Sequence, residues 1–290
     1  MNRKTKKELW HLLIDGQQDT DTGVYGNFYA YGNHLGDALD KTIKASNGHE
    51  FSNHNLIEAS LLENFDAIDN NAELIKIADD VYMRPAMYTY PFDDPEQSFV
   101  PPSGIVKSAG DGGYDYDLIK EAFVAYRADE NGVFKFEMVL AKQHLIGTFI
   151  TAIGFLPTID RLWIDIKDDW ENELAERWVA KHFTDKHTVI DFLNRQKADT
   201  LENGYLSIAV HSIQGETTLT LNDHKKIHLH TQDENVFRNF IGNIIGLGYT
   251  QTRDFYSLEF GYHHFHYRLA DSLTRTDFKQ LLTANNFEQI

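Results

Sequence analysis

The sequence predicts an α+β protein of two units, with mostly antiparallel sheets and helices packed on one face of those sheets. Two kinds of hydrophobic spacing support this class, because alternation with period two and spacing of three to four residues occur in separate segments. The C-terminal third gives the order β-β-β-α-β-β-α, which favours an antiparallel sheet with its helices on one side. With 42% hydrophobic residues, the 290-residue chain can fill two cores.

A run of prolines and glycines divides the chain. Five of the six prolines fall between Pro85 and Pro102, and a glycine-rich stretch up to Gly113 follows them. Such residues interrupt helices and strands. We therefore expect a small α+β domain at 1–90, a connector at 91–117 and a larger α+β domain at 118–290.

The expected first domain mixes strands and helices. Apolar residues Ile57, Leu61, Phe65 and Ile68 follow one another at helical spacing and predict a helix over 55–68. The other expected elements are strands at Leu9–Ile14, Asn27–Tyr31 and Val81–Tyr90 and a helix at Leu35–Ala45.

The second domain is expected to begin with a hairpin of 122–128 and 133–140. Its loop Glu130-Asn131-Gly132 suits a left-handed Gly132 and pairs Tyr126 with Phe136 and Val124 with Met138. A helix at Leu145–Phe155, stopped by Pro157, and a strand alternating through Leu162, Ile164 and Ile166 follow.

The C-terminal segments have the clearest patterns. A strand at Tyr205–Ile213 precedes a hairpin of Thr217–Leu221 and Lys226–His230, in which the loop 223–225 pairs Leu221 with Ile227 and Leu219 with Leu229. Thr231 and Glu234 fit a capping box for a helix that ends at Gly248. Two more strands and a final helix capped by Thr274 complete the expected order.

Composition excludes several classes of function. The net charge of −17 disfavours binding to nucleic acid or anionic membranes. The chain has no cysteine, which rules out disulfides and thiolate chemistry and fits a cytoplasmic location. The apolar stretch behind the basic N-terminal cluster is too short for a signal peptide. We find no nucleophile elbow, phosphate-binding loop or dinucleotide motif, so the catalytic residues, if any, are unknown.

Histidines are concentrated near the C-terminus. Seven of the 14 lie between His211 and His266, and four form the pairs His228/His230 and His264/His266. Residues two apart on a strand point the same way. A turn at Gly261-Tyr262 would restore one apolar face to 256–267 and set Glu259 opposite His264. The five candidate ligands for zinc, iron or nickel are Glu259, His264, His266, His228 and His230.

A solvated sheet face offers another interpretation of these histidines. Antiparallel sheets often expose one polar face, on which histidines are tolerated without any ligand. Arg268 beside the second pair would also repel a cation. Both interpretations stay open at this point.

Acidic stretches suggest a third kind of surface. Carboxylates and tryptophans alternate around 163–176, as in interfaces that face a basic protein. The candidate partner-binding residues are Trp163, Asp165, Asp168, Asp169, Trp170, Glu171 and Glu173. A solvated acidic face with inward tryptophans is the alternative.

The sequence thus predicts a cytoplasmic interaction module, of inhibitor or immunity type, for a basic partner. The competing hypothesis is a divalent-metal-dependent enzyme or metal-binding module that uses the histidine-rich sheet face. A third alternative is a structural protein or small-ligand binder that catalyses no reaction.

Overall fold

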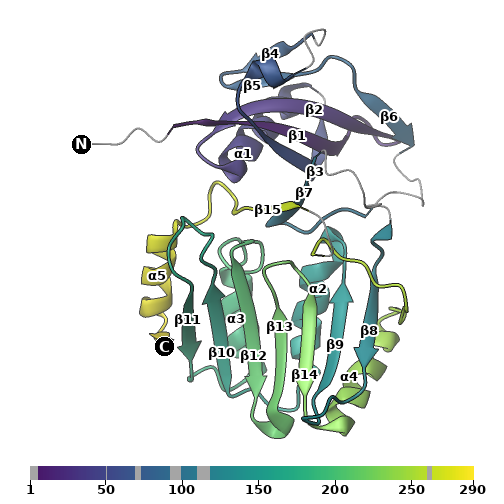
Figure 1. Ribbon diagram of the computed structural model, residues 1–290, viewed down its shortest axis with the longest axis vertical. Helices are drawn as coiled ribbons and strands as arrows, with labels where there is room; N and C mark the ends of the chain where they lie inside the picture. The colour runs from purple at the N-terminus through teal and green to yellow at the C-terminus, as the bar shows by residue number, and fades with distance from the viewer. Residues whose placement is uncertain (1–5, 50, 69–72, 92–98, 110–117, 260–262) are drawn as a thin grey trace.

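In the computed structural model the chain forms two sheets, one above the other along the long axis (Figure 1). The structure describes residues 6–49, 51–68, 73–91, 99–109, 118–259 and 263–290. Within these ranges no helix has the length and apolarity needed to span a membrane.

The first sheet, sheet A, has the strand order β15-β7-β3-β1-β2-β5-β4, and β6 also pairs with β2. Its strands are β1 (Glu8–Gln17), β2 (Thr22–Gly32), β3 (Ser52–Leu62), β4 (Ile75–Ala78), β5 (Val81–Met83), β6 (Tyr88–Pro91), β7 (Ile105–Ser108) and β15 (His264–His266). Helix α1 (Leu35–Ser46) packs on this sheet through Leu35, Ala38 and Leu39. The β3–β7 pair is parallel and the others are antiparallel.

The second sheet, sheet B, is antiparallel throughout, with the order β16-β11-β10-β12-β13-β14-β9-β8. Its strands are β8 (Ala122–Tyr126), β9 (Phe134–Val139), β10 (Arg161–Ile166), β11 (Glu176–Ala180), β12 (Leu206–Ser212), β13 (Thr217–Leu221), β14 (Ile227–Thr231) and β16 (Glu288–Gln289). The predicted pairs of Leu221 with Ile227 and Leu219 with Leu229 are confirmed.

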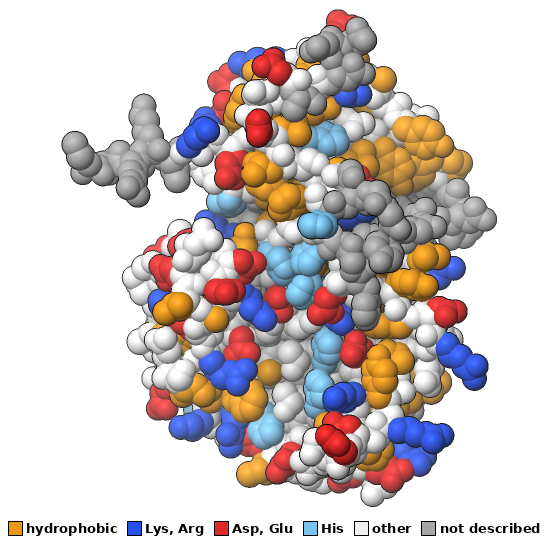
Figure 2. All heavy atoms as spheres, viewed as in Figure 1, with side chains coloured by type: hydrophobic (Ala, Val, Ile, Leu, Met, Phe, Trp, Pro, Cys, Tyr) orange, Lys and Arg blue, Asp and Glu red, His pale blue; other side chains and the backbone are white. Residues whose placement is uncertain are grey.

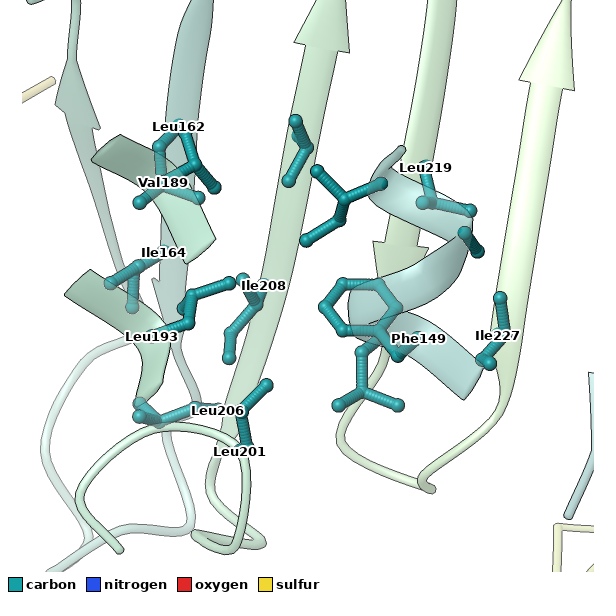
Figure 3. Close-up of a cluster of buried hydrophobic side chains, with 14 of the residues drawn as sticks. Phe149, Leu162, Ile164, Val189, Leu193, Leu201, Leu206, Ile208, Leu219 and Ile227 are labelled. Carbon is teal, nitrogen blue, oxygen red and sulfur yellow. The ribbon is translucent and has the colours of Figure 1, made fainter. Parts of the chain in front are cut away.

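Four helices cover one face of sheet B (Figure 1). They are α2 (Lys142–Ile153), α3 (Lys186–Arg195), α4 (Glu234–Gly246) and α5 (Arg275–Ala284). Figure 3 shows Phe149 of α2 and Leu193 of α3 among strand residues such as Ile164 and Ile208. Alternate strand residues therefore enter this core, and the intervening residues form an uncovered polar face. The predicted α+β class with helices on one face is confirmed.

One predicted helix is wrong. Residues 55–62 belong to β3, which pairs with β1 so that Leu12 lies opposite Ala59 and Leu13 opposite Glu58. Helical spacing over four residues is compatible with a strand when a long-range partner is available. In this strand Ile57 is buried, whereas Leu61 is 50% exposed.

Two other predictions are corrected in register or continuity. The strand expected over Val81–Tyr90 is broken into β5 and β6. In the first hairpin of sheet B the turn closes as expected between Asp129 and Val133, but the strands pair Phe123 with Met138 and Ala125 with Phe136. An extra residue in the first strand, after Tyr126, shifts the register by one and buries Phe123 in place of Val124.

The C-terminal segment also departs from expectation. The Gly261-Tyr262 turn lies outside the described residues; β15 pairs with β7, which lies inside the expected connector. The described residues 255–259 form no strand. The N-cap of α4 is Asp233, whose carboxylate accepts from the backbone N–H groups of Asn235 and Val236, so the Thr231 capping box is wrong. The domain division itself stays a prediction.

Candidate functional site

Three histidines meet at the junction of the two sheets. His264 and His266 lie on β15, and His224 lies in the turn between β13 and β14. One ring nitrogen from each lies within 4.8 Å of the others. Figure 2 shows histidine side chains following a line down the middle of the visible face, across this junction. We call His224, His264 and His266 the histidine cluster.

Each ring of the cluster approaches the other two. The ring centroid of His224 lies 4.8 Å from that of His264 and 5.2 Å from that of His266. The centroids of His264 and His266 are 5.0 Å apart. The Nε2 atoms of His264 and His266 are separated by 3.1 Å. Two imidazole nitrogens so close are arranged either to share a proton or to bind one cation.

Two of the rings have a polar contact on their outer side, a hydrogen bond at His266 and a carboxylate contact at His224. The Nδ1 atom of His266 lies 2.6 Å from the carbonyl oxygen of Gly204 and donates to it, which leaves the Nε2 lone pair directed at His264. The Nδ1 atom of His224 lies 3.3 Å from Asp223 Oδ2. A carbonyl or carboxylate behind each imidazole is the usual outer shell of histidine metal ligands.

The backbone holds β15 in place through close glycine contacts. Gly204 donates to the carbonyl of Tyr267, and Tyr267 donates to the carbonyl of Gly104. A Cβ atom on Gly204 would lie 1.7 Å from the carbonyl oxygen of Gly104, so only glycine fits. Tyr205 adds a hydrogen bond from its hydroxyl to the carbonyl of His266.

The turn that carries His224 is fixed to the same segment. Asn222 accepts from the backbone N–H of Lys226, and Lys225 adopts the left-handed conformation with φ of 57°. The ammonium of Lys225, buried with 2% exposure, donates to the carbonyls of Leu201 and Asn203. Burial lowers the pKa of Lys225 to about 7. Segment 201–204 thus contacts both parts of the histidine cluster.

Electrostatics favour the neutral imidazole at His224 and His266. Burial lowers the pKa values of His224 and His266. Asp223 and Asp169 act on His266 in the opposite direction, and they would offset the charge of a bound cation. Neutral imidazoles are the form that binds metals.

Glu259 is close to the histidine cluster, but its carboxylate pairs with a lysine. Its carboxylate forms an ion pair with the buried ammonium of Lys226, which also lies 3.1 Å from Glu137. Burial raises the pKa of Glu259, but the hydrogen bond and charge of Lys226 and the nearby His224 and His228 together bring the pKa below its usual value. His224 Nδ1 is 3.9 Å from this carboxylate.

The other predicted pair lies farther down sheet B. His228 and His230 project from β14 on the polar face with parallel rings 6.3 Å apart, opposite Thr220 and Thr218. Nε2 of His228 is buried and has no hydrogen-bond partner among the described residues. Neither residue is part of the histidine cluster.

Arg268, whose charge would repel a cation bound beside it, makes its hydrogen bonds to the backbone that follows β15. Its guanidinium donates to the carbonyls of Leu269 and Ser272 in the next turn. Its side chain therefore contributes to local backbone structure after β15.

The predicted partner-binding residues are dispersed. Trp170 is in the core with 2% exposure, and Trp163 lies on the polar face between the guanidinium of Arg177 and the ring of His211. Arg177 also holds Asp165 with two hydrogen bonds. The exposed carboxylates belong to the loop after β10: Asp168, Asp169, Glu171 and Glu173. The basic protein partner stays a prediction.

His224 was not among the residues selected from the sequence. It lies in the seven-histidine segment, but in a hairpin loop without a period-two partner. His224 becomes part of the histidine cluster only because β15 lies close to the turn between β13 and β14. No protein family model, curated protein or solved structure matches this chain.

Proposed function

We propose that this protein binds a divalent transition metal, zinc first, through His224, His264 and His266. The observation that carries the proposal is the meeting of three imidazoles from two distant segments, each offering one nitrogen within 4.8 Å of the others. The hydrogen bond of His266 to Gly204 and the contact of His224 with Asp223 support it, because a carbonyl or carboxylate behind the ring is typical of histidine metal ligands.

The spacing of the nitrogens suits zinc. With zinc–nitrogen bonds of about 2.0–2.1 Å, two ligands of a tetrahedral site lie about 3.3 Å apart. The 3.1 Å between the Nε2 atoms of His264 and His266 is close to this value. The third nitrogen, on His224, lies within 4.8 Å of the other two and must approach them to complete a tetrahedral site.

Three protein ligands leave a coordination position open. Catalytic zinc sites have this composition, whereas structural sites are closed by four protein ligands. A metal in the histidine cluster would lower the pKa of a bound water and supply a hydroxide nucleophile. Metal-assisted hydrolysis is therefore the chemistry that we propose for the site.

Removal of matched histidine pairs tests the site. We expect the purified wild type to bind one equivalent of zinc in a calorimetric titration and by elemental analysis, and H264A/H266A to bind none. H228A/H230A removes the same number of imidazoles from a strand and should keep the zinc, because that pair lies outside the histidine cluster.

Two results would contradict the proposal. One is less than a tenth of an equivalent of zinc, iron or nickel in the loaded wild type. The other is loss of metal from H228A/H230A with retention in H264A/H266A. H224A separates the three-ligand site from a two-histidine site, since only the former loses affinity when His224 is removed.

A further inference from the structure

A second candidate site lies where sheet A meets helix α2 and the segment 197–202 that follows α3. It is a pocket of about 460 Å³, within the usual range for small-molecule sites. Polar side chains from four segments line it: Asn55, Ser103, Lys142, Gln143, Lys197 and Glu202. Nothing in the proposed metal chemistry uses these residues.

Lys142 is the central cation of this pocket. Its ammonium lies 3.0 Å from Asn55 Oδ1 and 3.4 Å from the carbonyl oxygen of His54. Both acceptors are neutral, although the side chain is partly buried. An ammonium has three donors, so the two contacts found among the described residues leave one N–H for a ligand.

The carboxylates near Lys142 are committed to other groups. Glu202 pairs with Lys197 at 3.1 Å. Asp15 is separated from Lys142 by the amide of Asn55, whose Nδ2 lies 3.5 Å from Asp15 Oδ2. Asp15 also accepts a hydrogen bond from the hydroxyl of Tyr90, and burial raises its pKa. The pocket lining therefore has an excess of positive charge in a protein whose net charge is −17.

We propose that this pocket binds a small oxyanion, a carboxylate or phosphate group of a metabolite, with Lys142 as its principal contact. Charge-assisted hydrogen bonds from an ammonium to such groups are among the strongest in proteins. Ser103 and Gln143 offer neutral donors beside it, and Lys197 adds a second cation at the rim. The ligand would place a negative charge in direct contact with Lys142, whose hydrogen bonds among the described residues go to neutral oxygens.

The proposal has a consequence for pH dependence. Burial lowers the pKa of Lys142, Lys197 lowers it further, and Glu202 and Asp15 act in the opposite direction. A bound anion favours the protonated ammonium and raises this pKa. Affinity for the anion is therefore full below the pKa of Lys142 and falls as the pH rises through it.

Titration of the metal-free full chain with inorganic phosphate and, separately, with succinate tests the site. We expect at least one of the two to bind, and K142M to raise its dissociation constant roughly tenfold or more, as loss of a charged hydrogen bond does. K181Q makes the same change of charge at a lysine that does not line the pocket and should bind like the wild type. H264A/H266A should also bind normally, which separates this site from the metal.

Amine labelling of the wild type gives a measurement that does not depend on the folding of K142M. Acetylation of Lys142, followed by mass spectrometry, should slow when the binding anion is present, while Lys181 is labelled at an unchanged rate. Protection by phosphate alone or succinate alone identifies the oxyanion. Failure of both to bind or to protect Lys142 overturns the proposal.

Discussion

Individual histidines make the stability of the protein sensitive to acid. Burial lowers the pKa values of His54 and His228 to about 4, from an ordinary value of 6.5. His54 is neutral in the fold, where its Nε2 lies 2.7 Å from the hydroxyl of Ser46. In the unfolded chain both residues take up protons near pH 6.5. The unfolded state then binds more protons between pH 6.5 and 4.

We predict that the free energy of unfolding decreases as the pH falls through this window. H54Q should reduce the slope by up to one proton, because it removes one of the groups that charge only on unfolding. Urea unfolding of the metal-free protein at several pH values measures this slope. As a control, H187Q replaces an imidazole whose side chain is 84% exposed and should reduce the slope less than H54Q does. An equal slope in H54Q and the wild type would contradict the assignment.

Among the elements, β15 is a short strand that contacts two glycine-containing loops. It has three residues, and the carbonyl of Gly204 orients His266 while Gly204 touches Gly104. We predict that G204A lowers zinc affinity by about 10–100-fold, as loss of an outer-shell partner does, and lowers stability. Calorimetric titration and thermal unfolding measure the two effects.

A glycine without close neighbours provides the control for this substitution. Gly242 lies in α4, and a Cβ atom there would meet nothing within 4 Å. G242A should keep the zinc affinity and slightly stabilise the helix, since alanine is the better helix former. Unchanged zinc binding in G204A would show that the glycine contact does not position His266.

The strands differ in how far their pairing could be predicted from local sequence. The β13–β14 register follows from alternation and loop length, and both are local. The strand β3 does not follow from local sequence, because Ile57, Leu61 and Phe65 have helical spacing. Pairing with β1, a long-range interaction, makes this segment a strand. In the β8–β9 hairpin, one extra residue moved every pair without changing the turn.

For the whole molecule, the histidine cluster joins the two sheets, since β15 belongs to sheet A and the His224 turn to sheet B. The sequence supplied His264 and His266 as candidates, but not His224. Their meeting depends on the order of strands in two sheets, which no local pattern encodes. Glu259 was placed opposite His264 by an expected hairpin, whereas β7 is the partner of β15.

We predict that zinc stabilises both sheets together. At a free concentration one hundred times its dissociation constant, zinc should add about 2.7 kcal/mol to the free energy of unfolding if it binds only the folded state. Differential scanning calorimetry with and without zinc measures this. H264A/H266A should show no shift of the transition, and a shift of equal size in that variant would place the metal elsewhere.

The route of the chain through β15 has a consequence for biosynthesis. Its partner strand β7 is made early, but His264–His266 emerge from the ribosome only after nearly all of sheet B has been translated. During translation of sheet B, the β7 edge of sheet A therefore lacks its partner strand β15. Nascent chains stalled before residue 264 should expose that edge to chaperones and to one another.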